Sequence, residues 1–175
     1  MTAFTLQPFA SPHPDITISG TLDRNGEQLA IAYTVSGHLE QVRIPSPSLS
    51  PTRQYNLWEA TCLEFFLGLP NQPHYWEFNL SPAGDWNVFH LEDYRQNLRE
   101  ALAVDAVSLQ VASDASRLTL SLRFNLADLM APSQPLEVGI CAVIQSAQGQ
   151  LSYWALTHPG SEADFHRRES FILQI

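Results

Sequence analysis

The fold is decided by residues 56–91, NLWEATCLEFFLGLPNQPHYWEFNLSPAGDWNVFHL. Successive side chains of a β-strand point to opposite faces of the sheet. The pattern therefore predicts a core face with Leu63, Phe65, Leu67, Trp76, Phe78 and Leu80, and an outer face with Trp58, Cys62, Glu64, Phe66, Tyr75, Glu77 and Asn79. The intervening residues PNQP (70–73) and SPAGD (81–85) are typical of turns. This stretch is therefore predicted to form two consecutive hairpins.

The rest of the chain repeats this pattern of short strands and turns. Further strands are predicted at 16–19, 29–35, 107–112, 118–124, 136–145, 151–156 and 170–175. Such spacing favours an all-β antiparallel sandwich, jelly-roll or immunoglobulin-like, with roughly nine to eleven strands. Two short helices are also predicted, at 92–103 and at 125–130 behind the polar cap Asn125. No repeat or composition shift divides the chain, so we expect one domain over residues 1–175.

Composition narrows the classes of partner. The 175 residues carry a formal net charge of −9, and all nine basic residues are arginine. A chain this acidic lacks the positive surface potential that binds nucleic-acid phosphates or an anionic membrane surface. Residues 1–15 have neither the basic start nor the apolar stretch of a signal peptide, so we expect a cytoplasmic protein. Cys62 and Cys141 are then expected to be reduced core residues.

Two carboxylates are predicted to meet on the outer face. If the first hairpin is centred in its loop, the numbers of opposing residues sum to about 141, which sets Glu64 opposite Glu77. Like charges directly opposite destabilise a sheet. The repulsion must be offset by an arginine such as Arg43 or Arg123, a bound cation, a shared proton or ligand hydroxyls.

The second hairpin brings amides and aromatic rings to the same face. Asn87 is expected near Asn79, and Trp86 follows the turn, either on this face or in the core. Sugar recognition uses rings for stacking and amides or carboxylates for hydroxyls. The candidate ligand-binding residues are Trp58, Glu64, Tyr75, Glu77, Asn79, Trp86 and Asn87. The alternative is an ordinary solvated sheet face.

A second cluster of polar residues lies near the C-terminus, in the segment SYWALTHPGSEADFHRRESF (152–171). His158, Asp164 and His166 are candidate ligands of a divalent cation, and either histidine is a candidate axial ligand of haem. The structural alternative is that Asp164 caps the turn while each histidine bonds a backbone carbonyl.

Enzyme signatures are few. The sequence contains no phosphate-binding glycine loop, no G-x-S-x-G and no H-E-x-x-H. Glu64 and Glu77 could serve as the carboxyl pair of a retaining glycosidase, but an open sheet face offers no wall to separate their pKa values. We therefore expect no enzymatic activity.

The runs LWEATCLEFFL (57–67) and YWEFNLSPAGDW (75–86) resemble DOMON-like domains and the family 9 carbohydrate-binding modules, with their strand xEhFL followed by YxEFxxxPxG. The ending SYWALTHP (152–159) with DFH (164–166) is similar to a small bacterial branch of that superfamily. The resemblance implies a β-sandwich that binds a sugar or haem, with Glu64, Glu77 and Asn79 beside the ligand.

Two departures from these families matter. The modules carry an aspartate before xEhFL where this chain has Thr61-Cys62, which speaks against an inherited calcium site. Haem-binding relatives use a Met–His pair, whereas Met1 and Met130 are the only methionines here.

Together these features predict a non-catalytic module for a small ligand, most simply a saccharide or cell-wall sugar. Two alternatives stay open. One is a haem- or metal-binding protein using His158 or His166; the other is a protein-interaction module without a small ligand, for example one that forms a homo-oligomer.

Overall fold

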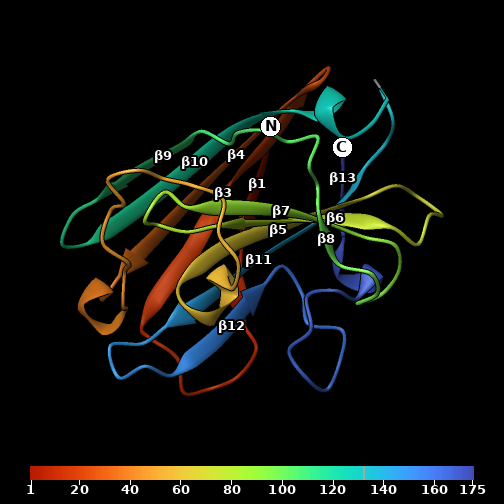
Figure 1. The fold of residues 1–175 in the computed structure, drawn as a ribbon. Helices are drawn as coiled ribbons and strands as arrows, with labels where there is room; N and C mark the ends of the chain where they lie inside the picture. Colours follow the sequence, from red (N-terminus) through yellow and green to blue (C-terminus); the bar gives the residue numbers. More distant parts are fainter. Residues whose placement is uncertain (132) are drawn as a thin grey trace.

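The structure, a computed structural model, describes residues 1–131 and 133–175. It contains two antiparallel sheets that form a sandwich (Figure 1). The first sheet has five strands, in the order β1 (Thr2–Thr5), β3 (Ile16–Asn25), β4 (Gln28–Gly37), β10 (Arg117–Asn125) and β9 (Leu109–Ser113). The second has eight: β2 (Gln7–Pro8), β12 (Leu151–Ala155), β11 (Glu137–Gln145), β5 (Cys62–Gly68), β6 (Tyr75–Leu80), β7 (Trp86–Leu91) and β8 (Arg99–Glu100), with β13 (Leu173–Gln174) on β11.

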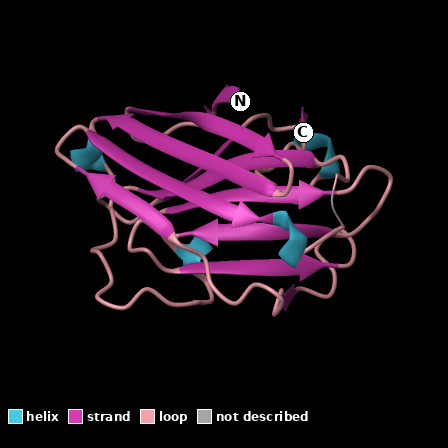
Figure 2. Ribbon diagram, turned by 90° about the horizontal axis from the view of Figure 1, so that it is seen from above, coloured by secondary structure: helices cyan, strands magenta, loops and turns pink. Residues whose placement is uncertain are grey.

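The predicted all-β antiparallel sandwich is confirmed. The described residues form thirteen strands, more than predicted, because β1, β2 and β8 lie outside the predicted strand segments; β2 and β8 are only two residues long. Regular helical structure is limited there to four single 3₁₀ turns, η1 (Leu39–Gln41), η2 (Leu57–Glu59), η3 (Leu126–Asp128) and η4 (Arg168–Ser170) (Figure 2). Accordingly, no helix among these residues has the length and apolarity to span a bilayer.

The predicted helix at 92–103 is wrong. Arg95 and Asn97 both adopt a φ of 53°, a left-handed conformation that ends a right-handed helix. Leu98 and Leu102, whose spacing of four residues suits one face of a helix, are both exposed. The segment is a loop that leads into β8. The prediction at 125–130 is confirmed only as the 3₁₀ turn η3, where Asn125 Oδ1 accepts a hydrogen bond from Ala127 N (3.2 Å).

The core lies between the two sheets, and aromatic rings connect them. Phe78 of β6 stacks on Phe65 of β5, with ring centroids 4.2 Å apart, and meets the edge of Phe124 from β10 at 5.1 Å. Tyr33 of β4 donates a hydrogen bond from its buried hydroxyl to the carbonyl oxygen of Glu64 (2.8 Å). This bond crosses the core and fixes β5 at the residue whose side chain emerges on the opposite face.

The predicted alternation is correct, but the outer face of the eight-stranded sheet is not open. All residues of β5 and β6 are buried, because segments outside the sheet cover the face directed away from the core. Trp58 of η2, together with Phe165 and Phe171 of the segment after β12, packs against Phe66 and its neighbours on that face. This C-terminal segment is the blue chain that leaves β12 in Figure 1.

Candidate functional site: a covered pocket with two buried carboxyl groups

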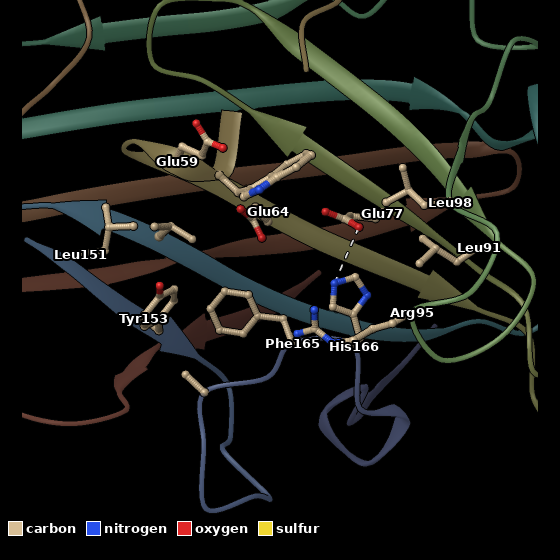
Figure 3. A pocket seen from close by; sticks show the side chains of 13 residues that line it. Glu59, Glu64, Glu77, Leu91, Arg95, Leu98, Leu151, Tyr153, Phe165 and His166 are labelled. Carbon is tan, nitrogen blue, oxygen red and sulfur yellow. Dashed lines mark ion pairs between the residues drawn. The ribbon is translucent and has the colours of Figure 1, made fainter. Parts of the chain in front are cut away.

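A pocket of about 530 Å³ lies between the outer face of the eight-stranded sheet and the covering segments (Figure 3). The strands contribute Glu64, Glu77, Leu91, Val143, Leu151 and Tyr153. The covering segments contribute Trp58, Glu59, Arg95, Leu98, Ala163, Phe165 and His166. The volume is within the usual range for small-molecule sites.

Two glutamates from adjacent strands form the polar floor of this pocket. Glu64 is 2% exposed and Glu77 is 5% exposed. One oxygen of each has a partner: Cys141 Sγ donates to Glu64 Oε2 (3.7 Å), and Asn79 Nδ2 donates to Glu77 Oε1 (2.8 Å). The other oxygens, Glu64 Oε1 and Glu77 Oε2, are buried without a hydrogen-bond partner in the described residues. Since buried polar atoms are normally paired, these two are positioned to receive a donor from a ligand.

The predicted register of the first hairpin is wrong by two residues. Glu64 pairs with Asn79, and Glu77 pairs with Phe66, so the two carboxyl groups lie on a diagonal rather than directly opposite. The paired residue numbers sum to 143, because β5 ends at Gly68 and β6 begins at Tyr75, which centres the loop one position further along the chain than the prediction assumed. A shift of two residues keeps every side chain on its predicted face. The predicted opposition of Asn79 and Asn87 is confirmed.

Burial makes both carboxyl groups hard to ionise. It raises the pKa of Glu77 from 4.5 to about 7, although Asn79 and the Arg95 guanidinium act in the opposite direction. Burial, followed by repulsion from Glu77, raises the pKa of Glu64 well above its ordinary value. The arginine near the pair is Arg95, neither Arg43 nor Arg123 as proposed from the sequence. The two carboxyl groups therefore ionise less readily than exposed glutamates, and a positive charge beside them would favour their ionised forms.

A hydrogen-bonded group holds His166 at the rim, next to Glu77 (Figure 3). Tyr75 Oη accepts a hydrogen bond from Arg95 N (3.2 Å) and lies 2.8 Å from His166 Nδ1. This arrangement favours donation from the tyrosine hydroxyl to Nδ1, which leaves the proton of the imidazole on Nε2, 4.0 Å from Glu77 Oε2. Burial and then the charge of Arg95 lower the pKa of His166 to about 4, so the imidazole is neutral at neutral pH.

Asp164 fixes the segment that covers the pocket. Its carboxylate accepts hydrogen bonds from Tyr94 Oη (2.6 Å), Arg95 Nη2 (2.9 Å) and His166 N (3.1 Å). Although burial acts in the opposite direction, the bonds from Tyr94 and Arg95 hold the pKa of Asp164 below its usual range. The negative charge of Asp164 therefore offsets the positive charge of Arg95.

Three of the seven predicted ligand-binding residues line the pocket: Trp58, Glu64 and Glu77. Two others lie behind them. Tyr75 is fully buried and holds His166, while Asn79 holds Glu77. These two side chains position the residues that reach the pocket.

The remaining two predicted residues belong to a different cluster. Trp86 lies in the core, with the Arg53 guanidinium 4.5 Å from the centre of its ring. The side-chain amide of Asn87 is already fully hydrogen-bonded. Its oxygen accepts from Arg53 Nη1 (2.7 Å), and its nitrogen donates to Gln54 O (2.9 Å) and Glu100 Oε1 (3.1 Å). Neither residue reaches the pocket, so the site is smaller on this side than predicted.

Sequence reasoning missed much of the pocket wall, in particular Arg95, Leu98, Val143, Tyr153 and Phe165. Val143 and Tyr153 could have been found, because both alternate with core residues along predicted strands. No local signal marks Arg95, Leu98 or Phe165, since irregular loops bring them to the pocket.

The architecture has relatives among solved structures. A protein from Bacteroides uniformis described as carbohydrate-binding matches with a TM-score of 0.67 and 13% identity, over 94% of this chain and 83% of that chain. A family 9 carbohydrate-binding module from Caldicellulosiruptor kristjanssonii, in complex with glucose, matches with a TM-score of 0.52 and 9% identity, over 94% and 78%. The fold is that of the family 9 modules. No family model and no curated protein matches the sequence itself.

The Met–His pair of haem-binding DOMON-like proteins is not formed in this structure. Met130 packs against the core between the sheets, whereas His166 lies on the opposite face of the eight-stranded sheet, so the two do not form an axial pair. His158 Nε2 is bonded to the carbonyl of Gln7 (2.9 Å). The proposed structural role is thus correct for His158 and for Asp164, which caps the turn at His166 N. It is wrong for His166, whose partner is Tyr75.

The same geometry separates the candidate metal ligands of the sandwich. The side chains of His158, Asp164 and His166 have different partners, namely Gln7 O, Tyr94 and Tyr75, and residues 1–131 and 133–175 contain no cluster of three or more metal-ligating side chains. Cys62 and Cys141 are free, buried thiols, as expected, but they lie on the pocket face beside Glu64 rather than in the core between the sheets.

Proposed function

We propose that this chain is a non-catalytic module that binds a saccharide in the pocket over the eight-stranded sheet. One observation carries the proposal: Glu64 Oε1 and Glu77 Oε2 are buried, lack partners among the described residues and belong to side chains that line the pocket. An unpaired buried acceptor is costly, and a ligand donor removes that cost.

The walls of the pocket suit a sugar ring. Trp58 and Phe165 provide apolar surface on which the C–H face of a pyranose can pack, while the carboxyl oxygens accept its hydroxyl protons. Tyr153, which is 38% exposed, widens the apolar wall toward solvent. The volume of about 530 Å³ accommodates a mono- or disaccharide. That a family 9 module of this fold was solved with glucose supports the same class of ligand.

A binding role is favoured over hydrolysis by the placement of the two carboxyl groups. Glycosidases set an acid and a second carboxylate on either side of the scissile bond. Glu64 and Glu77 instead rise from neighbouring strands of one floor. The relatives of similar fold are also described as carbohydrate-binding.

Isothermal titration with a panel of mono- and oligosaccharides tests the proposal. We expect at least one sugar to bind, and Glu77→Gln and Trp58→Ala each to weaken that sugar about tenfold or more. Glu162→Gln is the matched control, because Glu162 is exposed on the covering segment and does not line the pocket. The proposal fails if no sugar binds, or if both pocket variants bind the sugar as tightly as the unmodified protein.

A further inference from the structure

The charges around the pocket do not balance. Glu64 and Glu77 form its floor, and the cation that lines it, Arg95, is ion-paired with Asp164 at 2.9 Å. Arg167 lies on the same side and also faces Asp164, at 3.4 Å. Within the described part of the chain, the floor therefore lacks a cation of its own.

The unpaired oxygens show where a positive group would be held. Glu64 Oε1 and Glu77 Oε2 both lack a partner in the described residues, and Figure 3 shows the two carboxyl groups next to each other in the pocket. Arg95 and His166 contact neither oxygen within hydrogen-bond distance; the imidazole is 4.0 Å from Glu77 Oε2. A donor that also carries charge would pair both oxygens and offset their mutual repulsion.

A metal ion suits this floor poorly. Calcium takes six to eight oxygen ligands, and the described residues have no group of three or more metal-ligating side chains. An ammonium group needs only a few acceptors, and the faces of aromatic rings such as Trp58 and Phe165 also attract it. A small organic cation matches both the two carboxyl groups and the aromatic wall.

We propose that the ligand is an amino sugar whose free ammonium group is held by Glu64 Oε1 and Glu77 Oε2, with Trp58 and Phe165 packed on the sugar ring. This inference rests on the proposed saccharide function and specifies its substrate class. It predicts that a hexosamine binds more tightly than both the parent hexose and the N-acetylated derivative, which carry no charge.

The test compares glucosamine, galactosamine and mannosamine with their parent hexoses and their N-acetyl derivatives, by titration calorimetry on the unmodified protein at pH 7.5. Cyclohexylamine is included as a cation of similar size without hydroxyls. We expect at least one hexosamine to bind about tenfold or more tightly than its neutral counterparts and than cyclohexylamine. Glu64→Gln and Glu77→Gln should each remove that preference, whereas Glu162→Gln should keep it.

The outcomes separate this inference from the proposed function. Equal binding of a hexosamine and its hexose, or tighter binding of the N-acetyl form, overturns the amino-sugar inference and leaves the saccharide proposal in place. Equal binding of cyclohexylamine and the best hexosamine overturns the saccharide proposal, since it shows a cation site without sugar recognition. Binding of none of these compounds overturns both. The comparison among ligands needs no variant, so a variant that fails to fold does not decide the result.

Discussion

Replacing Glu77 by glutamine should change how the stability of the protein depends on pH. The pKa of Glu77 is raised from 4.5 to about 7 by burial, so the folded protein holds a proton that the unfolded chain releases earlier. The free energy of unfolding therefore falls as the pH rises from about 4.5 to about 7, and it levels off above that range. At about 1.4 kcal/mol per pH unit, the whole interval corresponds to about 3 kcal/mol.

Glutamine has nearly the same shape and stays neutral, so it keeps the bond from Asn79 and removes the titration. The groups that face Glu77 are Glu64 from β5, Arg95 from the loop after β7, and His166 from the covering segment. All three are retained in the variant. We therefore expect Glu77→Gln to be more stable than the unmodified protein by about 2–3 kcal/mol at pH 8, and nearly equal to it at pH 4.5.

Urea unfolding followed by tryptophan fluorescence, at several pH values between 4.5 and 8, measures this difference. Glu162→Gln is the control, because it makes the same change of charge at an exposed site and should keep the pH slope of the unmodified protein. If Glu77→Gln loses as much stability between pH 5 and pH 8 as the unmodified protein, Glu77 is not the buried, proton-holding group described above.

Two further predictions concern the segment that covers the pocket. A methyl group at Gly68 would overlap the guanidinium of Arg168, which is paired with Glu137 and donates to Leu69 O (3.0 Å), so Gly68→Ala should cost about 1–3 kcal/mol of unfolding free energy. A double-mutant cycle with Arg168→Ala checks this, because the cost should largely vanish once the guanidinium is gone; an unchanged cost would contradict it. Since the pKa of His166 is lowered to about 4, its imidazole should stay neutral at pH 5.5 in an NMR titration, and a midpoint near 6.5 would show that this ring is solvated rather than buried.

The sheets could be predicted from the sequence because alternation is a local property. Along YWEFNL, each side chain lies on the face that its position indicates, and an error of two residues in the register leaves that assignment intact. The same alternation predicts Glu64 and Glu77 on one face, and both side chains line the pocket on that face. The wrong helix at residues 92–103 also has a local cause. The spacing of Leu98 and Leu102 suits a helix, but Arg95 and Asn97 adopt a left-handed conformation that interrupts it.

The enclosure of the site could not be predicted in this way. It depends on loops that return over the outer face, and their positions are set by long-range contacts such as Arg95 with Asp164 and Tyr75 with His166. No periodicity encodes such contacts. The open face expected from the strands alone is therefore a pocket, and burial, rather than direct opposition, is the main reason why the glutamates resist ionisation.

The central claim is that Glu64 and Glu77 contact a sugar in the covered pocket. A crystal structure of the protein with the tightest-binding sugar from the titration panel tests it most directly. We expect density for that sugar between Trp58 and Phe165, with ligand atoms within hydrogen-bond distance of Glu64 Oε1 and Glu77 Oε2. A sugar bound outside this pocket, or inside it with both oxygens still unpaired, would show that the two glutamates do not hold the ligand.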